Sequence, residues 1–392
     1  MSSSTPPFRN MFEATKMLHT SIYGLLIAGF GVAAPQFPNL TGQYPVGTVN
    51  LEVVDNSRTD PFAPSPQPRA LMVSVFYPAS ETAITSGNYS FAPYFSSPKT
   101  AAAFDNYLGN STEILEIVTR SYDQAPITKS DFPLLIFSHG LGSSRFMHRA
   151  QLEDLASHGW IIVAPDHPYD ALITEYPDAS VISMDPKVLD DFPQALPRLI
   201  DIRVADVEFI ANAFKSVTTL SQIPGLNSSG DTIHSDQIGI FGHSLGGATA
   251  AQTVSNSSKF PCGANFDGGI FGPVAKSGLD KPFLQIGAQD HNQSTDHTFA
   301  DFWSHLRGFR REFVINGTVH IAFMDVPVLR DLLGEAFPAQ QRNQSGSIAG
   351  ERLLEIETAL INSFFAFCLK GTSADELDSL ARRFPDVSVP HT

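Results

Sequence analysis

The sequence Gly-His-Ser-Leu-Gly at residues 242–246 constrains the fold more than any other feature of the chain. An apolar run at residues 237–241 leads into it, and small residues suited to a helix follow at 245–254. Between a strand and a helix, Gly-x-Ser-x-Gly holds the serine hydroxyl above a sheet on a strained turn, and side chains at its glycine positions would collide with neighbouring backbone. This context predicts that Ser244 is a nucleophile. The simpler alternative is a strand-to-helix turn with a capping serine.

Strand-like and helix-like segments alternate along most of the chain. The strand-like segments are continuously apolar, which is typical of a parallel sheet covered by helices on both faces. With the serine turn, this pattern predicts an α/β-hydrolase fold with a mostly parallel, doubly wound sheet, in one domain over residues 35–392. The expected strands cover residues 71–77, 133–137, 160–164, 237–241, 262–266, 283–286 and 311–315; the expected helices cover 152–158, 199–214, 245–254 and 352–369, with a proline-rich loop at 60–68.

A serine nucleophile of this kind needs two backbone N–H donors for the oxyanion that forms during the reaction. One is expected from Leu245, the residue after the serine. The other is expected from the loop after an earlier strand, and Leu141 lies there between two glycines, in Ser-His-Gly-Leu-Gly. A plain glycine turn is the simpler interpretation of that loop. The helix that begins at Leu245 also points its positive end at the site.

The general base should be a histidine that follows the serine, because the chain order in this fold is serine, acid, histidine. His320 lies in a loop after the last expected strand, from which it can reach back over the sheet edge to the serine. His291, His297 and His305 lie before that strand and are expected on or near a surface helix. We therefore predict that His320 is the base.

Two aspartates compete for the role of the acid that orients the histidine. Asp267 ends an apolar strand in Asn-Phe-Asp-Gly-Gly, and Asp290 follows the next strand within the polar run Gln-Asp-His-Asn-Gln-Ser. Both strand ends face the same edge of the sheet, so topology alone leaves both open. An orienting acid must be rigidly held, which favours Asp267 over Asp290.

The composition excludes some classes of partner. Hydrophobic residues make up 42% and charged residues 17% of the 392 residues, which is typical of a globular protein. The formal charge of −15 repels phosphate backbones, so nucleic acid is not expected as a partner. Cys262 and Cys368 allow one disulfide in an oxidising compartment, but two small buried apolar residues are the simpler expectation.

Two features favour export. The stretch at residues 18–34 is apolar from Ile22 and ends in small residues before Pro35, which is typical of a secretory signal peptide cleaved near Ala34. Residues 1–16 are polar, and Met17 would make a better start; a membrane anchor or a buried helix is the alternative to a leader. Eight Asn-x-Ser/Thr sequons also favour a secreted, N-glycosylated eukaryotic protein: Asn39, Asn88, Asn110, Asn227, Asn256, Asn292, Asn316 and Asn343.

Five stretches match one known family in order. They read Phe137-Ser-His-Gly-Leu-Gly, Asp154-Leu-Ala-Ser-His-Gly-Trp-Ile-Ile-Val-Ala-Pro-Asp-His, Gly242-His-Ser-Leu-Gly-Gly, Asn265-Phe-Asp-Gly and Gly317-Thr-Val-His. The chain thereby resembles the secreted and type II platelet-activating factor acetylhydrolases, from about residue 73 to 325, and is most similar to fungal and actinobacterial members. The membrane-docking helices of the animal enzymes are not identifiable here.

The resemblance implies a serine esterase that cleaves short sn-2 acyl esters of phospholipids, as a 1-alkyl-2-acetylglycerophosphocholine esterase does. It implies Asp267 as the acid, Leu141 and Leu245 as oxyanion donors, and neither calcium nor another metal or cofactor. Contact with a lipid surface is compatible with it, and the oligomeric state stays open. The segment 169–197, rich in acids and prolines, is expected at the pocket rim. The alternatives are a general carboxylesterase, lipase or cutinase-like polyester hydrolase, and, more remotely, a non-catalytic binding protein.

Overall fold

The computed structural model describes residues 34–104, 108, 112–190, 193–226 and 233–390. Except for Ala34, the expected N-terminal extension and leader at residues 1–34 lie outside the described residues. All of the described residues except Ala34 fall within 35–392, the range expected to form a single domain.

Eleven strands form one sheet in the order β13-β12-β11-β10-β9-β5-β6-β2-β1-β4-β3, and β7 and β8 form a separate pair. The six central strands, β6, β5, β9, β10, β11 and β12 in sheet order, are parallel to one another, whereas β2 pairs antiparallel with β1 and β6, and β13 pairs antiparallel with β12. The strands are β1 (Val46–Thr59), β2 (Pro68–Pro78), β3 (Phe91–Pro93), β4 (Val118–Asp123), β5 (Pro133–Ser138), β6 (Ile161–Pro165), β7 (Ile173–Glu175), β8 (Val181–Ser183), β9 (His234–His243), β10 (Cys262–Phe266), β11 (Phe283–Ala288), β12 (Arg310–Ile315) and β13 (Val387–Ser388).

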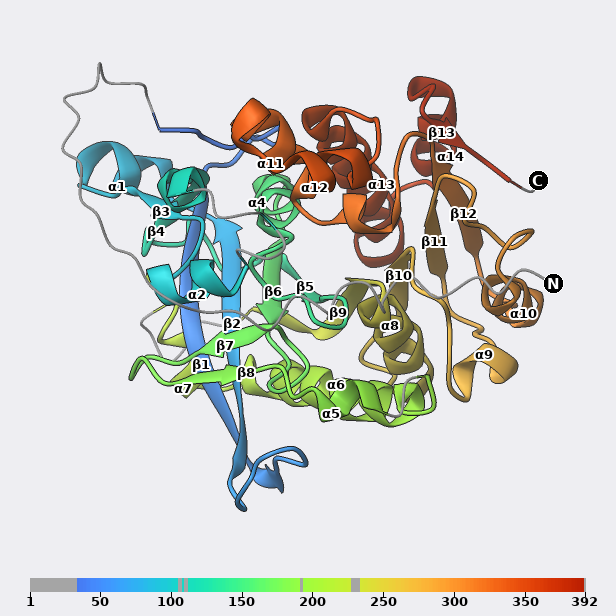
Figure 1. Cartoon of the computed structure of the whole chain (residues 1–392), viewed down its shortest axis with the longest axis horizontal. Helices are drawn as coiled ribbons and strands as arrows, with labels where there is room; N and C mark the ends of the chain where they lie inside the picture. The colour runs from blue at the N-terminus through green and yellow to red at the C-terminus, as the bar shows by residue number, and fades with distance from the viewer. Residues whose placement is uncertain (1–33, 105–107, 109–111, 191–192, 227–232, 391–392) are drawn as a thin grey trace.

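Helices cover both faces of this sheet, as expected for the α/β-hydrolase fold (Figure 1). They are α1 (Glu81–Ser86), α2 (Pro98–Ala103), α4 (Arg149–Ser157), α5 (Lys187–Asp190), α6 (Leu196–Ala213), α7 (Val217–Leu220), α8 (Leu245–Asn256), α9 (Val274–Ser277), α10 (His297–His305), α11 (Val326–Leu333), α12 (Ala339–Gln344), α13 (Gly350–Lys370) and α14 (Asp375–Arg383). Short 3-10 helices cover Thr112–Glu116, His320–Phe323 and Gly334–Ala336.

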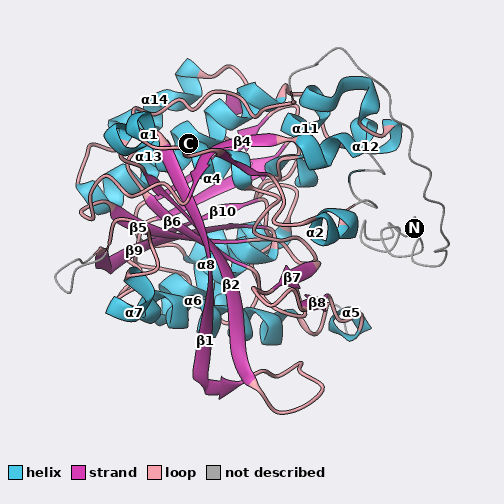
Figure 2. Cartoon of the chain, turned by 90° about the vertical axis from the view of Figure 1, so that its left-hand side faces the viewer, coloured by secondary structure: helices cyan, strands magenta, loops and turns pink. Residues whose placement is uncertain are grey.

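Side chains that alternate along the central strands pack in two separate apolar clusters. Leu135 and Phe137 of β5 pack in the cluster that α4 and α13 complete, and Leu134 and Ile136 pack in the cluster with α6 and α8. Figure 2 shows the sheet between these two helical layers. The expectation of continuously apolar strands is explained by this double coverage, because neither face of the central strands meets water.

On the side of the sheet beyond β6, the sequence predicted β2 at residues 71–77, but β1, β4 and β3 went undetected. β1 alternates buried and exposed residues along most of its length, for example buried Val53 and exposed Val54. One solvated face makes such a strand weakly apolar, so it lacks the continuous signal of the central strands. The proline-rich loop expected at 60–68 closes the β1–β2 hairpin, whose tip projects from the body of the molecule (Figure 1).

Cys262 and Cys368 form a disulfide between β10 and α13, which corrects the expectation of two unpaired buried residues. The bond joins positions 106 residues apart, with the Cα atoms 6.5 Å from each other. Closing a loop of that length restricts the unfolded chain, and in the chain-entropy model this stabilises the fold by about 5 kcal/mol. A sequence alone does not reveal the pairing, because it depends on how α13 returns to the sheet.

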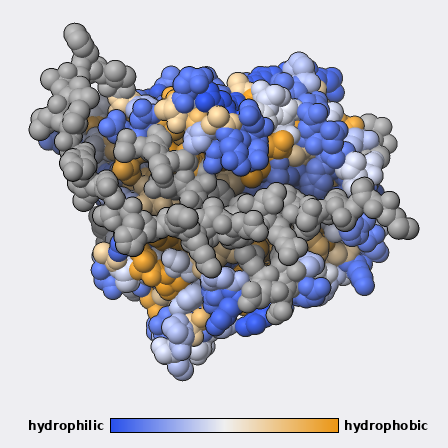
Figure 3. Space-filling model, in the orientation of Figure 1, coloured by the Kyte–Doolittle hydropathy of each residue, from blue (hydrophilic) through white to orange (hydrophobic). Residues whose placement is uncertain are grey.

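The coloured atoms in Figure 3 are mainly hydrophilic, with smaller apolar areas between them. Within the described ranges, no helix is both long enough and apolar enough to cross a membrane.

Candidate active site

Ser244 lies at the tight turn between β9 and α8, at the carboxyl edge of the sheet. Its backbone has φ 57° and ψ −122°, a conformation that non-glycine residues rarely adopt. A Cβ atom at Gly246 would approach the Ser138 carbonyl oxygen to 1.9 Å, and one at Gly242 would approach the Gly246 carbonyl carbon to 2.3 Å. These collisions, with a strand and a helix respectively, are those anticipated from the sequence, and they explain both glycines.

His320 lies beside this serine. Its Nε2 atom is 3.0 Å from the Ser244 hydroxyl oxygen, a distance at which the neutral ring accepts the hydroxyl proton. The loop after β12 delivers the histidine, and His243 supports that loop because its Nε2 is 2.9 Å from the carbonyl oxygen of His320. Burial and the nearby His320 lower the pKa of His243 well below its ordinary value, so His243 acts here as a neutral donor.

Asp267, rather than Asp290, contacts the ring of His320. The Asp267 Oδ2 atom is 2.6 Å from His320 Nδ1, and its side chain is only 2% exposed. Burial opposes its ionisation, but hydrogen bonds from His291 and His320 outweigh this effect and hold the pKa of Asp267 well below its ordinary value. Asp290 is exposed in the turn after β11, in agreement with the solvated position expected for it.

The other sequence candidates for the base lie elsewhere. His297 and His305 are exposed at the two ends of α10, as expected for a surface helix. His291, which the sequence placed with them, instead holds the second oxygen of Asp267, with its Nδ1 atom 2.6 Å from Oδ1. A histidine directly after Asp290 is the sequence signal for this second contact with the acid.

Gly140, in the loop after β5, packs against Ser244. A Cβ atom at Gly140 would lie 3.2 Å from the Cβ of Ser244, so the loop passes close to the serine. The Gly140 carbonyl accepts hydrogen bonds from the Arg203 guanidinium at 3.3 Å and from the backbone N–H of Ser143 at 3.2 Å. In a trans peptide the N–H points opposite to the carbonyl, so the Leu141 N–H is directed away from the buried arginine.

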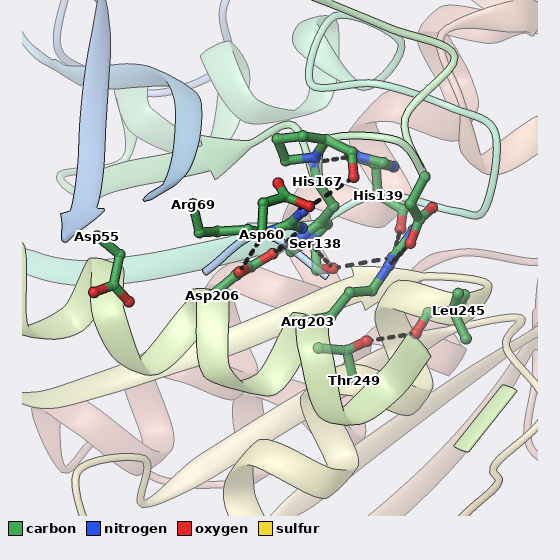
Figure 4. A network of polar contacts seen from close by, with 12 residues as sticks. Asp55, Asp60, Arg69, Ser138, His139, His167, Arg203, Asp206, Leu245 and Thr249 are labelled. Atoms are coloured by element: carbon green, nitrogen blue, oxygen red, sulfur yellow. Dashed lines mark hydrogen bonds and ion pairs between the residues drawn. The ribbon is translucent and has the colours of Figure 1, made fainter. Parts of the chain in front are cut away.

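Arg203 fixes this loop through a buried polar network. Its guanidinium binds both carboxylate oxygens of Asp170 at 2.6 Å and also donates to the carbonyl of His139. Figure 4 shows the network with α6 and α8. Ser138 links it to His167 at 3.0 Å, and His167 reaches Asp206 at 2.9 Å.

Arg69 completes the far end of the network by binding Asp206 at 2.7 Å and Asp60 at 2.9 Å. Burial would raise the pKa of Asp206, but Arg69 and His167 lower it well below its ordinary value. Sequence reasoning missed Arg203 and Asp206, although two charged residues on the apolar face of a helix were a usable signal. Buried charges persist only when they are paired, as they are here.

Metal ligation has no candidate in the described part of the chain, where no group of three or more His, Cys, Asp or Glu side chains is arranged to hold an ion. The site brings together a serine after β9, a carboxylate after β10 and a histidine after β12, with β11 between the last two strands. Such an arrangement can transfer an acyl group through the serine hydroxyl.

A mostly parallel sheet covered by helices, with the serine turn at its carboxyl edge, defines the class of α/β-hydrolases. The family model for "Platelet-activating factor acetylhydrolase, isoform II" matches residues 31–184 and 194–366, and the chain belongs to that family. The resemblance seen in the five sequence stretches is thereby confirmed.

Individual relatives agree with this family. The "Probable 1-alkyl-2-acetylglycerophosphocholine esterase" of Arthroderma benhamiae is 27% identical over 378 residues, covering 89% of this chain and 92% of that protein. The "Platelet-activating factor acetylhydrolase" of Bos taurus is 29% identical over 233 residues, 50% of this chain and 49% of that protein. Among solved structures, a ferulic acid esterase from Streptomyces cinnamoneus matches with a TM-score of 0.77 and 28% identity, covering 92% of this chain and 100% of that one. The chain is thus a carboxylic ester hydrolase.

Proposed function

We propose that the protein hydrolyses short sn-2 acyl esters of phospholipids through Ser244, His320 and Asp267. The observation that carries this proposal is a chain of two hydrogen bonds. The first joins the Ser244 hydroxyl to His320 Nε2 at 3.0 Å, and the second joins His320 Nδ1 to Asp267 at 2.6 Å. The names of the relatives from Arthroderma benhamiae and Bos taurus support the substrate class.

In the proposed mechanism, the Ser244 oxygen attacks the acyl carbonyl carbon while His320 Nε2 takes the hydroxyl proton. The backbone N–H groups of Leu141 and Leu245 stabilise the oxyanion, and Asp267 stabilises the imidazolium that forms. His320 then gives its proton to the departing alcohol oxygen, which leaves an acyl-enzyme. Water, deprotonated by His320, releases the carboxylic acid and restores the serine.

An apolar surface beside the nucleophile supports a hydrocarbon acyl group. Leu245 packs with residues of α6, and the partly buried Leu141, Met184 and Phe271 adjoin the same cluster. Met184 belongs to the segment 169–197, which supports the expectation that this segment forms part of the pocket rim. Partly exposed apolar side chains can cover a short acyl chain, whereas a long chain would require a more extended groove.

A panel of esters tests the substrate assignment. We expect kcat/KM to be highest for 1-alkyl-2-acetylglycerophosphocholine and to fall at least about 10-fold when the sn-2 group is hexanoyl or longer, because a longer acyl chain would require a more extended groove than the apolar side chains beside Ser244 provide. The second candidate is a general carboxylesterase, which the structural match to a ferulic acid esterase favours. Faster turnover of methyl ferulate or p-nitrophenyl butyrate than of the acetyl phospholipid would select that candidate.

We also propose that the protein is exported and N-glycosylated. Of the eight sequon asparagines, Asn39, Asn88, Asn256, Asn316 and Asn343 are exposed, and Asn292 is partly exposed; Asn110 and Asn227 lie outside the described residues. The Cys262–Cys368 disulfide also supports an oxidising compartment.

For the protein recovered from its own host, we expect an N-terminus near Pro35 and a faster gel mobility after treatment with an N-glycosidase, because the leader is removed and the exposed asparagines carry glycans. N-terminal sequencing of material from the culture medium measures the first quantity. An intact N-terminus on an unglycosylated protein inside the cell would contradict export.

A further inference from the structure

His291 occupies an unusual position between two carboxylates. Its Nδ1 atom is 2.6 Å from Asp267 Oδ1, and its Nε2 atom is 2.8 Å from Asp296 Oδ2. The other oxygen of Asp296, Oδ1, accepts the backbone N–H of Thr298 at the start of α10, at 2.6 Å, so both carboxylate oxygens have hydrogen-bond partners. Two carboxylate acceptors require a proton on each ring nitrogen, which makes the ring an imidazolium.

The charge states of the neighbours agree with this geometry. Burial opposes the charge on His291, but its contacts with Asp267 and Asp296 outweigh this effect and raise the pKa of His291 to about 10. Burial likewise opposes ionisation of Asp296, but the hydrogen bond from His291 contributes to lowering its pKa to about 2. His291 is therefore charged throughout the range in which a serine esterase works.

Asp267 is consequently shared by two histidines. One oxygen faces His320; the other accepts from His291 and from the backbone N–H of Ala288 at 2.6 Å. We propose that His291 is a positioning residue that anchors Asp267 and, as a fixed cation, sets the pH below which His320 becomes protonated and loses its function as a base. This inference rests on the proposed function of the Ser244 site.

Among the described residues, the other histidines near His320 do not supply that charge. His243, from the end of β9, lies with its ring centroid 4.7 Å from that of His320, and His148, from α4, lies 5.2 Å from His243. Burial lowers the pKa of His148 to about 3 and that of His243 well below its ordinary value, so both are neutral. Glu312 of β12 accepts hydrogen bonds from Gln293, two residues beyond His291, and a carboxyl group cannot supply a positive charge.

The sign of the expected effect follows from the charges. His291→Gln removes a cation next to Asp267 and keeps a hydrogen-bond donor, so the surroundings of His320 become more negative and favour its protonated form. Only the neutral form accepts the serine proton, so activity should disappear at a higher pH on the acid side. We expect the acid limb of kcat/KM to move up by about one pH unit, with a loss of about 10-fold below it and little loss above pH 8.

Two further variants separate charge from structure. His291→Lys preserves the cation and should leave the acid limb near that of the wild type. His305→Gln, an exposed histidine at the far end of α10, is the matched control and should change nothing. If the acid limb of His291→Gln coincides with the wild-type limb, or if the Gln and Lys variants lose the same factor at every pH, the inference is overturned.

A titration that does not require turnover keeps this test independent of the proposed function. In Ser244→Ala protein, histidine NMR resonances followed against pH should show His320 titrating at a higher pH when His291 is also replaced by Gln, with the His320 signal identified by its loss in a His320→Gln variant. An unchanged midpoint would overturn the role of His291. Full esterase activity of Ser244→Ala would instead overturn the proposed function while the titration result still stood.

Discussion

Ser244→Ala is expected to lower kcat for ester hydrolysis by a factor on the order of 10⁴ to 10⁶ while the protein remains folded. Without the hydroxyl oxygen no acyl-enzyme can form, and His320 loses the group whose proton it would take at 3.0 Å. What remains is the background provided by substrate binding and the oxyanion donors. Steady-state turnover of p-nitrophenyl acetate measures the loss, and circular dichroism with thermal unfolding checks the fold.

Ser255→Ala is a suitable control, because Ser255 is exposed on α8, the same helix that starts after the nucleophile. It should retain full turnover and wild-type stability. Near wild-type turnover of p-nitrophenyl acetate by folded Ser244→Ala would contradict the assignment of the nucleophile and, with it, the proposed mechanism.

Asp267→Asn is expected to reduce kcat by about 10⁴, whereas Asp290→Asn should cost less than about 10-fold. An asparagine amide can donate to His320 Nδ1, which would place the ring proton on Nε2, so the ring could no longer accept the proton of Ser244. The amide would also fail to stabilise the imidazolium. Asp290 lies exposed after β11 and serves as the matched control.

The two variants should be compared at the same pH and temperature with the same ester, after their melting temperatures have been measured. Asp267 also accepts the Ala288 N–H and holds His291, so some loss of stability is expected for Asp267→Asn. A larger loss of kcat in Asp290→Asn than in Asp267→Asn would mean that His320 takes its acid from the loop after β11.

Local sequence was sufficient to predict the strands and helices that are buried on both faces or bounded by sharp turns. The strand expected at 262–266 matches β10 residue for residue, and the helix expected at 352–369 differs from α13 by only a few residues. The position of Ser244 at a tight turn could also be predicted from local sequence, because glycines two residues away on either side specify the turn. His320 followed from chain order and from its place after the last central strand.

Features built from distant residues were not accessible in this way. β1 pairs antiparallel with β2, and its solvated face leaves little continuous apolar signal. β13 pairs antiparallel with β12 and is only two residues long, which is too short for a sequence pattern. The Cys262–Cys368 bond joins residues 106 positions apart and depends on the return of α13 to β10. Arg203 donates a hydrogen bond to the Gly140 carbonyl, 63 residues earlier in the chain, so no local sequence pattern predicts this contact.

The choice of acid shows most directly where sequence reasoning ends. The sequence alone predicted that a serine, a later histidine and one of two aspartates, preferably Asp267, meet at the carboxyl edge of an α/β sheet, because turn chemistry and strand burial are local properties. Only the tertiary structure decided that Asp267 is buried against His320 while Asp290 faces solvent, and that His291 turns back to share Asp267. The physical reason is that hydrogen bonds and buried charges depend on distances of a few ångströms, and those distances are set by the packing of strands and loops that lie far apart in the chain.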